Sequence, residues 1–304
     1  MKTNLATLAL VLALAGVCAA HTGQRLIEIF ELPTSQLPDV RDGSLDDWDQ
    51  NLPFASLDHR DFTDRSGNFA APDPTDLSLR AYLAWHSNTQ RLYIGLELLD
   101  DSYINQYPGG DPTLIADQDH LLFSIDGDHS GDAFVLAPFE SYTIEEHRLS
   151  DFSQAQQYRL IAQSPDGRQL VALGAARGWV DQPPYADAGS FHFDDVPSES
   201  IIEFYITPWN ALDWQGADRS LSTFLTPDRI VGLDLQFFDY DTAPGLLEDH
   251  FGLGVLPFDN ALRPIGADLF VDGLLIPCDV EDCSIADISA VTLDSWGRVK
   301  ASFK

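Results

Sequence analysis

Short apolar stretches separated by turn-forming residues recur along most of the chain. The clearest pair covers 79–85 and 91–99, and the Ser-Asn-Thr-Gln segment between them predicts a β-hairpin. Stretches of the same character lie at 120–125, 158–163, 169–173, 201–207 and 230–238. Helical periodicity is weak, and only 208–214 predicts a single helical turn. Many short strands joined by turns predict an all-β fold, an antiparallel β-sandwich.

The N-terminus has the pattern of a secretory signal peptide. A short segment carrying Lys2 precedes an apolar run over 5–17, and small residues lead up to Ala20. We therefore predict a signal peptide over 1–20, cleaved after Ala20, and a secreted, periplasmic or cell-surface protein. A lipoprotein cut before Cys18 is the less favoured alternative. No later stretch has the roughly 18 apolar residues of a membrane-spanning helix.

The remaining chain divides into three predicted parts. A leader over 21–38 precedes the β-sandwich, which we place at 39–258, and a C-terminal extension follows at 259–304. In the extension, Cys278 and Cys283 lie close together in a chain sent to an oxidising compartment, so a disulfide is expected. A zinc site would need two further ligands nearby. The apolar segment after the disulfide loop, from Ala290 to Phe303, predicts a final strand.

The charge excludes some classes of partner. The chain has 17 Lys and Arg against 48 Asp and Glu, a formal net charge of −31. Sequence-independent nucleic-acid binding needs clustered basic residues, so no nucleic-acid partner is expected. Adhesion to anionic membranes is disfavoured for the same reason. The hydrophobic fraction of 44% is ordinary for a globular protein, so the acidity does not indicate disorder.

The most chemically suggestive loop contains Asp126, Asp128 and Asp132. These carboxylates occupy nearby positions on a tight, glycine-containing segment that follows a predicted strand. Hard cations such as Ca²⁺ require six to eight oxygen ligands, roughly, and such a loop can supply several of them. The sequence therefore predicts a structural calcium site, and a solvated Asp-rich turn is the alternative.

A second, shorter pair of acids lies at another strand end. Asp239 and Asp241 follow the stretch 230–238 and give a further candidate calcium site. The pair Asp100–Asp101 ends the predicted hairpin and could contribute to either site.

Five segments in order resemble family 9 carbohydrate-binding modules and their DOMON-like relatives. They are the entry segment 39–48, the hairpin 83–101, the strand and acidic loop 119–128, and the later strands 203–212 and 232–241. The resemblance covers about residues 39–258. It implies a β-sandwich of two antiparallel sheets, structural calcium, and a sugar site built on aromatic side chains.

Sugar binding requires flat aromatic faces beside polar groups, and four aromatic residues are candidates. Trp179 and Tyr185 belong to one polar, proline-containing loop, and Trp214 to another. Trp85 ends a predicted strand and is a reserve candidate. For each Trp the alternative is a side chain that closes the edge of the core. Trp48, within the family pattern, is expected to pack in the core.

Together these features predict a secreted, non-catalytic, calcium-stabilised protein that binds a polysaccharide or another glycan. One alternative is an extracellular glycan-active hydrolase, which needs two carboxylates about 5 to 10 Å apart at a cleft. The sequence has no G-x-S-x-G motif of a serine hydrolase. Another alternative is a structural or adhesive surface protein that binds no sugar.

Overall fold

The computed structural model describes residues 25–51, 56–65, 73–131, 143–253 and 267–278. The predicted signal peptide, Asp132, Cys283 and the predicted final strand 290–303 lie outside the described residues. Cleavage after Ala20 and the Cys278–Cys283 disulfide therefore stay predictions. In the described part, no helix is both long and apolar enough to cross a membrane.

Strands dominate the described chain. They are β1 (Leu26–Glu31), β2 (Leu57–Asp58), β3 (Thr63–Asp64), β4 (Leu77–His86), β5 (Arg91–Asp100), β6 (His120–Asp126), β7 (Gln156–Leu160), β8 (Leu170–Ala172), β9 (Ala186–Phe193), β10 (Ser198–Ile206), β11 (Trp209–Ala211), β12 (Leu221–Ser222), β13 (Ile230–Asp239), β14 (Asp249–Gly252) and β15 (Val271–Ile276). The helices are α2 (Asp46–Asn51) and α3 (Ile144–Ser150), with 3-10 turns η1 (Thr34–Gln36), η2 (His59–Asp61), η3 (Pro112–Asp117), η4 (Ala217–Arg219) and η5 (Ala267–Leu269).

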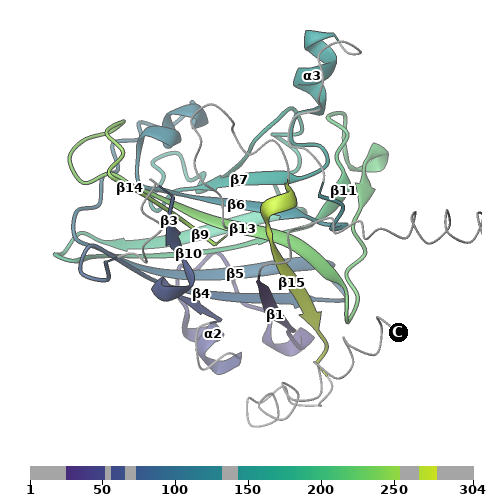
Figure 1. The fold of residues 1–304 in the computed structure, drawn as a ribbon, viewed down its shortest axis with the longest axis horizontal. Coiled ribbons are helices and arrows are strands. Elements are labelled where there is room, and N and C mark those ends of the chain that lie inside the picture. The colour runs from purple at the N-terminus through teal and green to yellow at the C-terminus, as the bar shows by residue number, and fades with distance from the viewer. Residues whose placement is uncertain (1–24, 52–55, 66–72, 132–142, 254–266, 279–304) are drawn as a thin grey trace, which may run out of the picture.

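All of these strands except β11 and β12, which form a separate pair, belong to one continuous sheet that folds over itself into two layers (Figure 1). The order is β8-β7-β6-β13-β15-β1-β4-β5-β10-β9, with β14 beside β13, β3 beside β14, and β2 beside β4. One layer contains β8, β7, β6 and β13, and the other contains β4, β5, β10 and β9. Strands β15 and β1 connect the layers on one side. The all-β sandwich predicted from the sequence is confirmed.

Strand β1 differs from the expected antiparallel arrangement. It pairs in parallel with β15, where Leu26 lies opposite Asp272, and in parallel with β4, where Phe30 lies opposite Ala84. Both β1, from the predicted leader, and β15, from the predicted extension, are integral to the sheet. The folded unit therefore extends beyond 39–258 on both sides.

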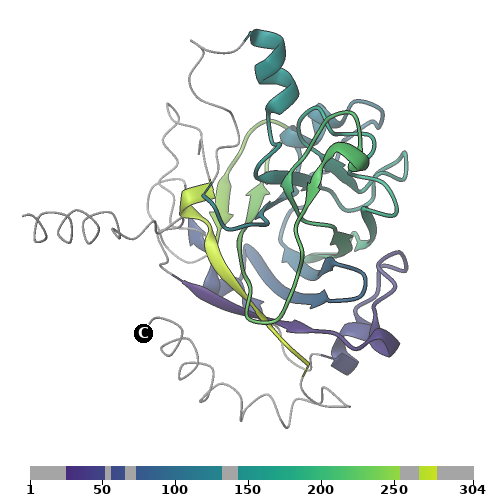
Figure 2. The same cartoon turned by 90° about the vertical axis from the view of Figure 1, so that its right-hand side faces the viewer.

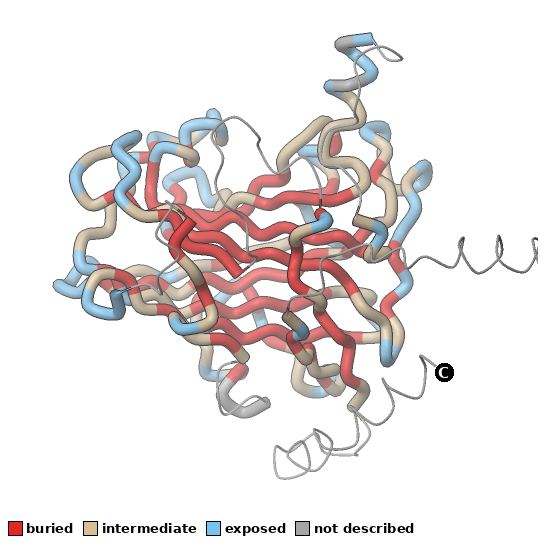
Figure 3. The backbone as a smooth tube through the Cα atoms, in the orientation of Figure 1, coloured by how far each residue is buried: buried red, intermediate tan, exposed pale blue. Residues whose placement is uncertain are grey.

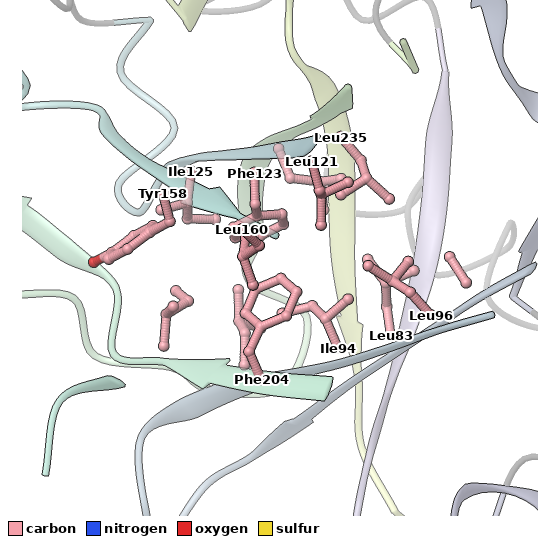
Figure 4. Close-up of a cluster of buried hydrophobic side chains, with 14 of the residues drawn as sticks. Leu83, Ile94, Leu96, Leu121, Phe123, Ile125, Tyr158, Leu160, Phe204 and Leu235 are labelled. Carbon is pink, nitrogen blue, oxygen red and sulfur yellow. The ribbon is translucent and has the colours of Figure 1, made fainter. Parts of the chain in front are cut away.

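The hydrophobic core fills the space between the layers (Figures 3 and 4). Leu83, Ile94, Leu96 and Phe204 project from one layer, and Leu121, Phe123, Ile125, Tyr158, Leu160 and Leu235 project from the other. Phe123 and Phe204 meet edge to face across the layers, with ring centroids 5.5 Å apart. Alternate residues of each strand point inward, so the period-two pattern of the sequence produces this core.

The entry segment covers part of the outer face of the β4-β5-β10 layer. Trp48 is 1% exposed, and its indole N–H donates to Glu203 Oε1 at 2.8 Å. A Cβ at residue 95 would lie 2.8 Å from the Trp48 ring, so Gly95 is required for this close approach. Trp48 therefore packs in a buried cluster, as the sequence predicted.

The helical turn predicted over 208–214 is wrong. Residues Trp209–Ala211 form β11 instead, which pairs with β12 through Trp209 and Ser222. Pairing with another strand overrides the weak local preference for a turn. The end of the molecule that carries β11 faces the viewer in Figure 2.

Candidate metal centre and aromatic site

Three buried carboxylates stand where the inward-facing pattern of their strands calls for apolar residues. Asp100 ends the inward series of β5, Asp239 ends that of β13, and Asp119 directly precedes β6. All three are at most 7% exposed, and their side chains provide oxygens within 4.8 Å of one another. We call this group the inner acidic site. It lies at one end of the sandwich, between the layers.

Further aspartates extend this group toward the solvent. Asp76, Asp101 and Asp241 provide oxygens within 4.8 Å of one another, and so do Asp76, Asp239 and Asp249. Asp76 and Asp239 thus connect neighbouring groups. We call the full set the acidic cluster, consisting of Asp76, Asp100, Asp101, Asp119, Asp239, Asp241 and Asp249.

The surroundings of the acidic cluster raise the pKa values of several of its carboxyl groups and so favour their neutral form. Burial, followed by the charges of neighbouring aspartates, raises the pKa of Asp239 to about 9. Burial is also the main cause that raises the pKa of Asp119 to about 8 and that of Asp241 to about 7. The pKa values of Asp76 and Asp100 rise to about 6. Carboxylates this close repel one another, so they need either protons or a cation between them.

The donor set fits a hard cation. Asp119 accepts hydrogen bonds from the backbone N–H groups of Ile104 and Tyr240, and Asp100 accepts one from Ser102. Oδ1 of Asp239 is buried, and no donor among the described residues reaches it. A cavity of about 30 Å³ borders the inner acidic site. Within the described residues the ligand atoms that converge at this site are carboxylate oxygens, the ligand type that Ca²⁺ prefers.

The structure brings the predicted pair Asp239 and Asp241 together with Asp100 and Asp101 in one cluster. Sequence analysis missed Asp76, Asp119 and Asp249. Each lies at or next to a strand end, and Asp249 is opposite Asp239 in the β13–β14 register. The signal that could have found Asp119 is its place one residue before the apolar stretch 120–125.

The other predicted calcium loop lies at the opposite end of the sandwich. Asp126 ends β6, is fully buried, and accepts a hydrogen bond from the Gly131 N–H at 2.8 Å. Asp128 accepts one from the Ser130 hydroxyl at 2.6 Å. Because Asp132 lies outside the described residues, calcium at this loop stays a prediction.

Aromatic side chains gather beside the β11 end. Trp179 contacts Tyr185 and Trp209 edge to face, with both centroid distances 5.3 Å, and Tyr185 contacts Trp209 at 5.5 Å. Trp209 is buried, whereas Trp179 and Tyr185 are half-buried. We call these three residues the aromatic group. Trp214 lies in the β11–β12 loop and is 45% exposed.

Trp85 has no exposed face for a sugar, and we withdraw it from the candidate contacts. Its side chain is fully buried in the core, and its indole N–H donates to the Ile276 carbonyl at 3.0 Å. Trp85 points inward from β4, in the same series as Leu83, so core packing explains it completely.

We expect the Trp85→Ala variant to lose about 3 to 5 kcal/mol of unfolding free energy, because a large cavity and an unpaired carbonyl remain. Urea unfolding followed by circular dichroism measures this loss. Glycan retention of the folded fraction should be unchanged. A stable Trp85→Ala variant with weakened retention would return Trp85 to the binding site.

No family model matches the sequence, and no curated protein matches it. The solved structures that are similar include two carbohydrate-binding modules. A family 9 carbohydrate-binding module from Caldicellulosiruptor kristjanssonii in complex with cellotriose has a TM-score of 0.51 and 15% identity, covering 84% of this chain and 97% of that one. A family 9 module from the same organism in complex with glucose has a TM-score of 0.49 and 16% identity, with coverages of 83% and 96%. The fold is that of a family 9-like module.

Proposed function

We propose that this chain is a secreted, non-catalytic carbohydrate-binding protein. In this proposal, calcium at the acidic cluster stabilises the sandwich, and loop aromatics contact the glycan. The shared fold with a module bound to cellotriose makes a neutral β-linked glucan the first ligand to test.

The aromatic group is the observation that carries the sugar-binding proposal. Trp179 and Tyr185 are half-buried on a loop. Trp214 is exposed and follows Trp209 closely in the sequence. The indole nitrogens of Trp179 and Trp209 are buried and have no acceptor among the described residues. Because these nitrogens are closed to a ligand in this structure, a glycan would contact the partly exposed rings and not the N–H groups. Exposed aromatic ring surface of this kind suits the apolar faces of a sugar.

In this proposal, calcium stabilises the fold and does not contact the aromatic group. Strands β5 and β13 end at the acidic cluster, whereas β10 runs from that end toward Trp209. The cluster and the aromatic group therefore lie at opposite ends of the sandwich.

A hydrolase is the less favoured function. In each group of the acidic cluster the carboxylate oxygens lie within 4.8 Å of one another, and Asp100, Asp119 and Asp239 are buried. Glycosidase carboxylates are separated by roughly 5 to 10 Å across an open cleft, to leave room for the substrate. The arrangement of the acidic cluster suits a cation better than a glycosidic bond.

Affinity electrophoresis and pull-down with amorphous cellulose, xylan, mannan and chitin test this proposal. Retention without release of reducing ends supports a binding protein. Release of reducing ends would establish a hydrolase. Neither retention nor release on any polysaccharide would favour the structural or adhesive alternative.

We expect the Trp214→Ala variant to bind the retained polysaccharide about tenfold more weakly, as is typical of exposed aromatic anchors. Its melting temperature should not change, because the side chain is largely exposed. Trp179→Ala should weaken binding and also reduce stability, since its ring packs on Tyr185 and Trp209. Phe224→Ala, at a residue 68% exposed, is the control. Full binding by both Trp variants would remove these side chains from the site.

A further inference from the structure

The loop that carries Trp179 and Tyr185 also lines a polar pocket. Asp181, Gln182 and Pro183 of this loop line it, together with the turn that contains Arg168 and with Asp187 of β9. Its volume is about 80 Å³. Strands β8 and β9 are the two ends of the strand path, so the pocket sits at the seam where the layers do not pair. We call it the seam pocket.

Asp181 forms a fixed wall of the seam pocket. Its side chain is fully buried and accepts hydrogen bonds from the backbone N–H groups of Gly178 at 2.8 Å and Ala172 at 3.2 Å. It also accepts one from Arg168 Nη2 at 3.2 Å. The guanidinium of Arg168 is therefore anchored at one end by a rigid carboxylate.

The rest of the Arg168 guanidinium is only partly paired within the described residues. Its Nε is buried and reaches no acceptor among the described residues. On another wall, Asp187 is held by Arg41 at 2.5 Å. A carboxylate has about four acceptor positions, so Asp187 can accept a further hydrogen bond. The Arg168 side chain is 40% exposed, so the part of its guanidinium outside the buried Nε offers a donor at the pocket, and Asp187 offers an acceptor with spare capacity.

A hydroxyl group matches this pair, because its oxygen accepts one hydrogen bond while its hydrogen donates another. The pocket is too small for a sugar ring but large enough for a group that projects from one. A carboxylate ligand fits poorly, since Asp181 and Asp187 line the pocket and the chain carries a charge of −31. A ring hydroxyl is attached directly to the ring, whereas a hydroxymethyl group extends one carbon farther into a recess.

We propose that the seam pocket binds the hydroxymethyl group of a hexose unit in a β-1,4-linked glycan, with Arg168 and Asp187 pairing with its hydroxyl. The inference rests on the proposed glycan-binding function. It assigns two roles to the loop 174–185. Trp179 and Tyr185 contact the sugar ring, and the segment 181–183 lines the pocket that selects the hydroxymethyl group. The protein then selects hexose-based over pentose-based chains.

Cellohexaose and xylohexaose separate these classes, because they share a β-1,4 backbone and only cellohexaose carries hydroxymethyl groups. Calorimetric titration of the wild-type protein should give at least about tenfold tighter binding of cellohexaose, the discrimination that a single buried group provides. In Arg168→Gln the preference should disappear through weaker binding of cellohexaose alone. Arg177→Gln, on the same loop and exposed, makes the same change of charge outside the pocket and should keep the preference.

Unchanged binding of xylohexaose by Arg168→Gln shows that the variant is folded and that only its affinity for cellohexaose is reduced. Two outcomes would overturn the inference and leave the proposed function intact. One is equal affinity of the wild-type protein for the two hexaoses, and the other is a preference for cellohexaose that survives in Arg168→Gln. In those cases the pocket holds only water. Binding of neither hexaose also overturns the inference. The polysaccharide panel then shows whether the proposed function fails with it.

Discussion

Removal of calcium with a chelator is expected to lower the melting temperature by about 5 to 10 °C, and Asp239→Asn should abolish most of that difference. A ligand that binds only the folded state at a hundredfold excess over its Kd adds about 2.7 kcal/mol, and each kcal/mol shifts a domain of this size by roughly 2 to 4 °C. Asp239 is central because it connects the inner acidic site with Asp76 and Asp249.

Two variants make this measurement specific. Asp126→Asn changes the other predicted calcium loop, so a calcium response that survives there but not in Asp239→Asn assigns the stabilising ion to the acidic cluster. Asp268→Asn, at an exposed position, controls for the loss of one negative charge. Identical melting curves with calcium and with chelator in the wild-type protein would contradict calcium binding at both sites.

The pH dependence gives an independent check. In the folded protein the pKa of Asp239 rises to about 9 and that of Asp119 to about 8, from an ordinary value of 3.8. Groups with raised folded-state pKa values favour folding at low pH, and this stability is lost as pH rises through those values. Without calcium, unfolding free energy should therefore fall between about pH 4 and pH 9. Calcium should remove the acidic-cluster part of this slope. Above about pH 6.5 the part from Glu203 remains, whose pKa rises to about 8. Below that pH, burial lowers the pKa of His120 and His250 to about 3, so these two residues make stability rise with pH.

The Arg65→Met variant is expected to lose about 3 to 5 kcal/mol of unfolding free energy, because it leaves the buried Asp234 carboxylate without its cation. Arg65 Nη2 lies 2.8 Å from Asp234 Oδ1, and the two side chains are 2% and 1% exposed. Gln236 also donates to Asp234 at 2.7 Å, but an amide does not neutralise a charge. Chemical denaturation at neutral pH measures the loss.

Arg80→Met is the matched control. Arg80 pairs with Glu97 at 3.7 Å, and its side chain is 64% exposed. Exposed pairs contribute about 0 to 1 kcal/mol, so this variant should be nearly as stable as the wild type. The Arg65→Met/Asp234→Leu double variant should recover part of the lost stability. A loss below about 1 kcal/mol in Arg65→Met would show that Asp234 is not a buried charge.

The central strands could be predicted because their sequences alternate strongly. The predicted hairpin 79–85 and 91–99 corresponds to β4 and β5, and the stretch 230–238 to β13. Strand β9 escaped prediction because its alternate positions are occupied by small and polar residues, as in Ala-Asp-Ala-Gly-Ser. It is held as an edge strand by its pairing with β10, which is information from tertiary structure.

The candidate sites were predictable as residue types but not as groups. The sequence places aspartates at several strand ends, yet only the register brings Asp76, Asp119 and Asp249 beside Asp239. For the aromatic residues, the sequence could not show which side chains are buried. Trp85 and Trp214 are both large rings near turns in the sequence. Only the tertiary structure shows that Trp85 is buried in the core, where its indole N–H donates to the Ile276 carbonyl.

The parallel pairing of β1 with β15 has a consequence for how the protein folds. Leu26 lies opposite Asp272, so nearly the whole described chain must be available before this part of the sheet can close. Contacts between residues so distant in sequence slow folding, because a long loop must be ordered first. Until β15 arrives, the edges of β1 and β13 remain unpaired and prone to association with other chains. The slowest folding step should therefore be the docking of β15.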